Sequence, residues 1–304
     1  MFEEGLPIKF QQLTLEEKPL FDKFFRARRY ENAHYNFTNL FMWRKAYNIQ
    51  WTLEGDYLCV KARWEGKTFF LPPFGPKQGL AGIVDCMLEH AKEEGFPFML
   101  QGVEAFMVQW LEEIKPGFFT SKPERDNYDY VYLAKDLIEL KGRKFHSKKN
   151  HVNSFRKNYS NYRYVPMTEE MTKECIDFMQ EWCDERGCVK GDDLDCERNA
   201  IVEAMNNFTV LGFQGGAIFI DDKMVAFSYG EMGNEDTAVI HVEKGRKGIN
   251  GVYGIINQEF CAHTFSRAVY INREEDMGIE GLRKAKESYH PVKMIEKYSV
   301  RLQG

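Results

Sequence analysis

The chain has 304 residues and a formal net charge of −5 at pH 7; 43% of its residues are hydrophobic and 14% are aromatic. This composition excludes an intrinsically disordered chain and is typical of a globular protein with sizeable hydrophobic cores. No apolar run is long enough to span a bilayer, and the N-terminus lacks the basic and apolar regions of a signal peptide. We therefore expect a cytoplasmic protein with reduced thiols.

The first half of the chain predicts helices and strands in alternation, separated by glycine- and proline-containing turns. A strand is expected at 8–13, helices from 15 and at 37–47, strands at 49–53, 57–63 and 67–71, a helix at 79–94, a strand at 98–103 and a helix at 105–114.

A stretch containing Lys, Pro and Gly at 115–127 is predicted to connect two domains. After it we expect a strand at 128–133, a helix capped by Asp136, a strand at 162–166, helices at 169–186 and 195–207, strands at 210–213, 216–220, 224–230 and 237–242, a helix at 251–264, a strand at 268–272, a helix at 279–289 and a strand at 293–300.

Both halves follow the same order of strand, two helices, a meander of strands, helix, strand and helix. This order resembles the GNAT acyltransferase unit, written twice. The predicted fold class is α/β (α+β), with two tandem GNAT-like domains, each a mixed, mainly antiparallel sheet flanked by helices. We expect the domains at 1–127 and 128–304, and the second contains more candidate functional groups.

Cysteines are the first candidates for a metal site. The chain has seven, and Cys175, Cys183, Cys188 and Cys196 lie close together in sequence. Their spacing contains no C-x₂-C pair, which structural zinc sites normally use. We therefore expect no metal site.

A basic segment between Leu140 and Thr168 contains eight lysines and arginines and no acidic residue. The remaining residues sum to −13 (−5 minus 8), so positive charge is concentrated in this segment. Such a concentration attracts phosphate-rich partners such as tRNA, for which Lys144 and Lys149 are candidate phosphate ligands. A solvated basic helix without a partner would show the same pattern.

Lys141 and Lys148 share a helical stripe with Phe145, Val152, Phe155 and Tyr159. A lysine in such a stripe either reaches the surface or points into a polar cavity, where it would contact a substrate. Gly142 could instead break this helix.

A glycine-rich junction links the strand at 237–242 to the helix at 251–264. Glycines allow the backbone to approach a ligand, and a helix N-terminus favours anions. The usual acetyl-CoA pattern, Arg/Gln-x-x-Gly-x-Gly/Ala, is not reproduced here, and the glycines could form only a flexible loop. The candidate ligands of a donor's phosphates are Arg246, Lys247, Asn250 and Gly251.

A cluster of three carboxylates at 274–276 follows the strand at 268–272. Mutual repulsion can raise a pKa in such a cluster toward the range of a general base, although acids also occur at helix starts for dipole reasons. The candidate catalytic residues are the carboxylates Glu243, Glu274 and Asp276 and the oxyanion-stabilising cations Lys148 and Arg283.

Two stretches resemble the DUF2156 family, which is related to the C-terminal domain of MprF-type phosphatidylglycerol lysyltransferases. They are Leu140-Lys-Gly-Arg-Lys-Phe-His-Ser-Lys-Lys-Asn and Asn272-Arg-Glu-Glu-Asp-Met-Gly, with Ile256-Asn-Gln-Glu between them. The resemblance implies tandem GNAT-type domains and aminoacyl transfer from charged tRNA. The candidate substrate pocket contains Asn257, Asn272, Arg273, Lys286 and Tyr289.

Three functions are compatible with these features. The first is aminoacyl transfer from charged tRNA to a small-molecule or lipid-headgroup acceptor. The second is acetyl-CoA-dependent N-acylation of a small amine, and the third is non-catalytic binding of tRNA or another polyanion. Aminoacyl-tRNA or acyl-CoA would be the donor, and no other cofactor is expected. The sequence leaves the acceptor and the oligomeric state open.

Overall fold

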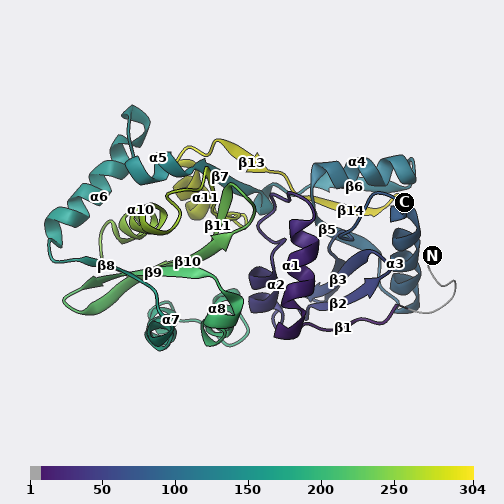
Figure 1. The fold of residues 1–304 in the computed structure, drawn as a ribbon, viewed down its shortest axis with the longest axis horizontal. Helices are drawn as coiled ribbons and strands as arrows, with labels where there is room; N and C mark the ends of the chain where they lie inside the picture. The colour runs from purple at the N-terminus through teal and green to yellow at the C-terminus, as the bar shows by residue number, and fades with distance from the viewer. Residues whose placement is uncertain (1–7) are drawn as a thin grey trace. The chain divides into compact units, whose positions relative to one another are not determined.

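The computed structural model describes residues 8–304, which divide into two compact units (Figure 1). Unit 1 comprises Met1–Tyr128 and Ile295–Gly304, and unit 2 comprises Asp129–Met294. The C-terminal segment therefore belongs with the N-terminal part of the chain, whereas the sequence placed it in the second domain. The reason is that β14 (Tyr298–Leu302) lies between β5 (Met99–Val103) and β6 (Phe119–Pro123) in the first sheet.

Unit 1 contains a seven-stranded sheet in the order β1-β2-β3-β4-β5-β14-β6, in which β4 and β5 are parallel. Its remaining elements are β1 (Gln11–Gln12), β2 (Gln50–Glu54), β3 (Tyr57–Trp64), β4 (Lys67–Phe70), α1 (Lys18–Arg26), α2 (Phe37–Trp43), α3 (Leu80–Glu93) and α4 (Ala105–Ile114).

Side chains alternate along β3, so the two faces of this sheet have different cores. Tyr57 and Cys59 belong to the core that α3 and α4 cover. The aromatic rings of α1 contact the rest of unit 1 edge-on, Phe21 against Trp51 and Phe25 against Phe74. Apolar burial on both faces stabilises unit 1.

Unit 2 contains a seven-stranded sheet in the order β13-β7-β12-β11-β10-β9-β8, in which β11 and β12 are parallel. Its strands are β7 (Asp129–Leu133), β8 (Arg163–Pro166), β9 (Gln214–Ile220), β10 (Lys223–Met232), β11 (Thr237–Gly245), β12 (Tyr270–Asn272) and β13 (Lys293–Ile295). Its helices are α5 (Ala134–Glu139), α6 (His146–Asn158), α7 (Thr172–Asp184), α8 (Asp193–Asn206), α9 (Phe208–Leu211), α10 (Val252–Thr264) and α11 (Glu280–Glu287).

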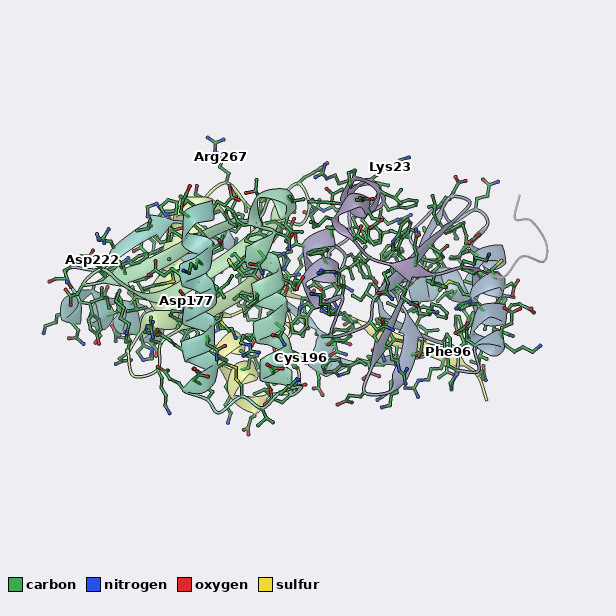
Figure 2. The ribbon with its side chains drawn as sticks, turned by 90° about the horizontal axis from the view of Figure 1, so that it is seen from below. Lys23, Phe96, Asp177, Cys196, Asp222 and Arg267 are labelled. Carbon is green, nitrogen blue, oxygen red and sulfur yellow. A yellow bond between two sulfur atoms is a disulfide. The ribbon has the colours of Figure 1, made fainter. Side chains whose placement is uncertain are left out.

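Helices cover both faces of the second sheet. Figure 1 shows α5, α6 and α10 on one face and α7 and α8 on the other. Figure 2 shows the latter pair in front of the strands, with Asp177 on α7 and Cys196 on α8. The buried core on the α10 side includes Phe155 of α6 and Ile256 of α10. This packing fixes α6 beside α10.

Four predicted elements differ from the structure. The helix expected to be capped by Asp136 begins at Ala134, so Asp136 lies within its first turn. Residues 210–213 were expected as a strand, but α9 forms there and ends at Gly212, whose φ of +74° favours glycine. The expected connection at 115–127 contains β6, and the expected strand at 293–300 is two strands in different sheets. Gly142 (φ +92°) does separate α5 from α6, so Lys141 lies outside the helix.

The structure joins Cys183 and Cys188 in a disulfide, which differs from the expectation of reduced thiols throughout. Gly187, with φ +68°, turns the chain after α7 so that the Cys188 amide donates to the Cys183 carbonyl. This turn brings the two sulfur atoms together.

The longest helices of residues 8–304 have 14 residues, and none in that range is both long and apolar enough to cross a membrane.

Candidate functional site

The candidate site lies where β11 and β12 separate. Their parallel pairing runs from Thr237–Tyr270 to Val239–Asn272 and stops there, whereas β11 continues to Gly245. Beyond that point, β11 has no strand partner on the β12 side within the described chain. The gap between β11 and the chain after β12 begins there.

An ion pair spans this gap. Arg273, the residue after β12, donates from Nε (2.9 Å) and Nη2 (2.6 Å) to Oε2 of Glu243 on β11. Both side chains are mostly buried, at 12% and 13% exposed. Burial would lower the pKa of Arg273, but Glu243 outweighs it and raises that pKa, so the guanidinium stays charged.

Two lysines add positive charge beside this pair. Lys148 of α6 is half-buried and lies 4.3 Å from the centre of the Tyr289 ring, which Arg273 also faces at 4.9 Å. Burial, with Arg273 nearby, lowers the pKa of Lys148. Lys286 of α11 donates to the backbone carbonyls of Arg273 and Glu274, and burial lowers its pKa to about 8. Arg273 thus has two further cations near it, Lys148 and Lys286.

Asn257 of α10 is 1% exposed, and neither its amide nitrogen nor its amide oxygen has a hydrogen-bond partner within the described chain. It lies on the same helix face as Gly254 and Cys261. A Cβ on Gly254 would be 3.8 Å from the Tyr289 hydroxyl. The charge of Glu243 helps to raise the pKa of the Cys261 thiol, so Cys261 lies near Glu243. This face therefore looks toward the ion pair.

Asn257 and the Glu243–Arg273 pair make up one cluster of buried polar side chains. In this cluster, Oε1 of Glu243 and Nη1 of Arg273 are also buried without a partner among residues 8–304. Leaving a buried polar group unpaired costs about 1–3 kcal/mol, so such groups are rare in folded proteins. Glu243 and Arg273 offer one acceptor and one donor beside the gap, and Asn257 offers one of each on the face of α10 that looks toward them. A ligand with adjacent donor and acceptor groups would satisfy them.

The loop after Arg273 is held in an uncommon backbone conformation. Glu274 (φ +57°), Met277 (φ +51°) and Gly278 (φ +73°) are all left-handed. A left-handed non-glycine residue costs about 1–2 kcal/mol, so the loop needs support. Asp276 and Arg283 provide it through the contacts described next.

Asp276 is fully buried and accepts four hydrogen bonds, from the Tyr130 hydroxyl (2.6 Å), Arg283 Nε and Nη2 (2.9 Å each) and the Gly278 amide (2.8 Å). Burial would raise the pKa of Asp276, but these donors outweigh it and hold the pKa well below its usual range. The expected roles of Asp276 as a base and Arg283 as an oxyanion ligand do not fit this geometry, because both carboxylate oxygens of Asp276 already accept hydrogen bonds and Arg283 donates from Nε and Nη2 to them.

Asn272 was expected in the pocket, but it is fully buried and holds the backbone. Its amide donates to Asp129 at 3.1 Å and accepts from the Glu274 amide at 2.8 Å. These two hydrogen bonds fix the backbone at the beginning of the loop.

The structure separates the expected donor-phosphate ligands. Arg246 turns toward the α7 side, where it contacts Glu181 at 2.5 Å and the Met224 carbonyl at 2.8 Å. Gly251 begins α10 with φ +82°, and a Cβ there would lie 2.6 Å from the His151 carbonyl of α6. Lys247 and Asn250 are exposed. The start of α10 is thus packed against α6, and Arg246 is not directed toward it.

The basic segment is partly neutralised. Four of its eight cations form ion pairs: Lys141 with Glu139, Lys144 with Asp136, Arg156 with Glu259 and Arg163 with Asp222. In the described chain, Arg143, Lys149 and Lys157 are exposed without an ion pair. Neighbouring residues of α6 therefore point in different directions, Lys148 toward the cluster and Lys149 toward solvent.

His241 was not singled out from the sequence. It is buried on β11, with Nδ1 3.0 Å from Glu274 and Nε2 3.1 Å from Glu231. Burial would lower its pKa, but the two carboxylates outweigh this and raise the pKa to about 9. The only signal in the sequence is a single histidine in an apolar strand, a pattern that also fits a core residue.

The corresponding gap in unit 1 is occupied by that unit's own side chains. There β4 and β5 pair only at Phe70–Leu100, and the Gly102 carbonyl of β5 accepts hydrogen bonds from Tyr35 and Asn32. The cluster of buried, unpartnered polar atoms described above lies in unit 2.

The two sheets, each with one parallel pair followed by a helix, define a tandem GNAT-like protein, as predicted. A tandem GNAT protein of the clavulanic acid biosynthesis pathway shares the fold, with a TM-score of 0.50 and 10% identity over 96% of this chain and 98% of that chain. The chain belongs to the family described as phosphatidylglycerol lysyltransferase, C-terminal, which matches residues 26–301. The resemblance noted in the sequence is thereby confirmed.

Two other solved structures are similar. A Bacteroides thetaiotaomicron protein of unknown function is 38% identical, with a TM-score of 0.91 over 97% of this chain and 100% of that chain. The DUF2156 domain of an Agrobacterium fabrum protein assigned as a lysylphosphatidylglycerol synthetase is 13% identical, with a TM-score of 0.67 over 95% and 92%. The latter likeness shows the fold alone. Among curated proteins, none matches the chain.

Proposed function

We propose that unit 2 transfers the aminoacyl group of a charged tRNA to an acceptor nucleophile. The observation that carries this proposal is the cluster of Asn257, Arg273 and Glu243, whose buried polar atoms lack partners beside the gap. An aminoacyl ester has an ammonium group on the carbon next to its carbonyl, so it presents a donor and an acceptor together. An acetyl group has no ammonium and would leave the amide oxygen of Asn257 unpaired.

In this proposal the residues act directly on the ester. Arg273 and Lys148 stabilise the oxyanion that forms at the carbonyl. Oε1 of Glu243 takes the proton of the attacking acceptor. The new bond forms at the carbonyl carbon as the bond to the ribose oxygen breaks, and that oxygen receives the proton. Because the ester is already activated, no covalent enzyme intermediate is needed. Transfer that is unchanged in Glu243→Gln would contradict this assignment.

The exposed cations of the basic segment support RNA as the carrier of this group. Arg143, Lys149 and Lys157 lie on the same segment as Lys148, which reaches the cluster. RNA phosphates bound on the solvent-exposed side of α6 would release counterions and contribute most of the affinity for tRNA. The aminoacyl end would then enter the gap next to the helix that holds the RNA. The family match to phosphatidylglycerol lysyltransferases agrees with this donor.

A pair of adjacent lysines separates RNA docking from the chemistry. Lys149→Ala is expected to weaken tRNA binding. It should also make the negative slope of log K against log salt shallower by about 1, equally for charged and uncharged tRNA. Lys148→Ala is expected to leave that slope unchanged, because Lys148 faces the cluster. Fluorescence anisotropy with labelled tRNA between about 50 and 200 mM salt measures both.

Equal salt slopes for the original chain and Lys149→Ala would contradict RNA docking on α6. Coenzyme A binding without tRNA binding would select an acyl-CoA donor instead. Salt-sensitive tRNA binding with no loss of the aminoacyl group to any acceptor would leave a non-catalytic tRNA-binding protein.

A further inference from the structure

His241 occupies an irregular position on β11. Across the β10–β11 pair, Tyr229 is opposite Val242 and Gly230 is opposite Ile240, so His241 is an extra residue without an opposite partner. A Cβ on Gly230 would lie 2.1 Å from the Val239 carbonyl, so the two backbones approach closely at this bulge. Such bulges often redirect a side chain beside an active site.

The hydrogen bonds of His241 require a particular protonation state. Nε2 faces Glu231 at the end of β10, and Nδ1 faces Glu274 in the loop after β12. An ionised carboxylate only accepts hydrogen bonds, so both ring nitrogens must donate, and only the imidazolium form does so. The ring is shielded from water, because its side chain is 1% exposed.

Other groups around the imidazole do not replace these contacts. The Tyr229 ring lies 6.3 Å away, and Glu197 of α8 and Cys175 of α7 lie near Tyr229. Burial raises the pKa of the Tyr229 hydroxyl, and Glu274 and Glu197 raise it further, so this group stays neutral. The charge balance at His241 is thus set by Glu231 and Glu274.

The imidazole connects the end of β10, which carries Glu231, to the loop after β12, which carries Glu274. No strand pairing joins these two segments within residues 8–304. β11 and β12 stop pairing at Val239–Asn272, immediately before His241 and Arg273. Glu274 is the next residue after Arg273, so a bond that fixes Glu274 also restricts where Arg273 can lie. The Arg273–Glu243 pair spans the same gap independently.

We propose that His241 is a positioning residue: held as an imidazolium between Glu231 and Glu274, it fixes the gap between β11 and the loop after β12, and with it Arg273. This assignment rests on the proposed aminoacyl transfer at that gap. His241 acts through Glu274 and does not touch the reacting ester.

The charge of the ring is tested without any activity assay. Nitrogen-15 NMR of the uniformly labelled chain, with the His241→Gln variant to assign the signal, reports the protonation of both ring nitrogens. We expect both to be protonated at pH 7.5, with loss of one proton as pH rises through about 9. A neutral His241 ring at pH 7.5 would overturn the proposal whether or not the chain transfers an aminoacyl group.

The effect on the site is tested by kinetics. His241→Gln is expected to lower kcat about tenfold with KM for charged tRNA nearly unchanged, because the RNA contacts α6. The original chain should lose kcat as pH rises through about 9, when the imidazolium deprotonates, and the variant should lack this step. A decline near pH 8 from Lys286, which donates to the Arg273 and Glu274 carbonyls, should remain in both proteins.

Glu231→Gln is the matched second variant, since it leaves the bond between His241 and Glu274 and should lower kcat less than His241→Gln does. An unchanged kcat and an unchanged step near pH 9 in His241→Gln would overturn the positioning role. If the original chain transfers no aminoacyl group, the proposed function fails, and a doubly protonated ring would still establish the imidazolium bridge.

Discussion

Asp276→Asn is expected to lower the free energy of unfolding of unit 2 by about 1–3 kcal/mol, because it removes the charge of a buried carboxylate whose partner, Arg283, is 31% exposed. The asparagine would leave the Arg283 guanidinium without its carboxylate, and one of the four hydrogen bonds to Asp276 would face an amide NH₂ instead of an oxygen. The loop also has left-handed residues at Glu274 and Met277, which then lack support. Both effects act in the same direction.

Urea denaturation followed by hydrogen exchange in peptides from β12 and α11 measures this change in unit 2. Glu280→Gln is the matched control, because Glu280 and Lys284 form an exposed ion pair on α11, the helix that also carries Arg283. Its effect should stay within about 0.5 kcal/mol. A cost below about 1 kcal/mol for Asp276→Asn would show that the buried pair does not hold the loop.

Asn257→Leu is expected to affect stability and transfer in opposite directions. Leucine has a similar volume, and the amide it replaces has no hydrogen-bond partner in the described chain, so the free energy of unfolding should stay the same or rise by about 1 kcal/mol. Aminoacyl transfer should fall about 100-fold, because the substrate loses a buried hydrogen-bonding partner. Thermal unfolding and transfer kinetics of one preparation give both values.

Asn272→Leu provides the matched comparison for Asn257→Leu. Asn272 is equally buried, but its amide is bound to Asp129 and to the Glu274 backbone, so its loss should destabilise unit 2 by about 2 kcal/mol. Comparable destabilisation by both substitutions would mean that Asn257 is a structural residue, and the case for a ligand there would be lost.

Local patterns predicted much of the fold, because they depend on neighbouring residues. The apolar stripe of Phe145, Val152 and Phe155 is buried as expected, and the repeated order of elements gave the tandem architecture. The return of β14 to unit 1 was not predicted, because a strand's pairing partner depends on residues far away in the sequence. The same holds for β6, whose exposed residues resemble a linker.

The candidate site could be predicted only in part. Asn257, Asn272, Arg273, Lys286 and Tyr289 were expected in one pocket; Arg273 does contact Tyr289 and Lys286, whereas Asn272 holds the backbone. Their roles in a substrate pocket stay a prediction. Arg246 and Arg283 have the same charge as Arg273, but sequence does not show that Glu181 and Asp276 bind them. Residue type identifies a cation, whereas its partner decides whether that cation is available to a substrate.

His241 was missed because its importance depends on acids that are distant in sequence. Glu231 and Glu274 lie on either side of it only after β10, β11 and the loop following β12 are assembled. A histidine in an apolar strand otherwise resembles an ordinary core residue.

Isothermal titration calorimetry with 3′-aminoacylamido-3′-deoxyadenosine, a stable analogue of the aminoacyl end of tRNA, tests the central claim most directly. The account predicts binding to the original chain and at least about tenfold weaker binding to Asn257→Leu, with 3′-amino-3′-deoxyadenosine, which lacks the aminoacyl group, binding far more weakly. Equal affinity of the original chain and Asn257→Leu for the analogue, or no preference for the aminoacyl group, would contradict the placement of the aminoacyl site at Asn257, Arg273 and Glu243.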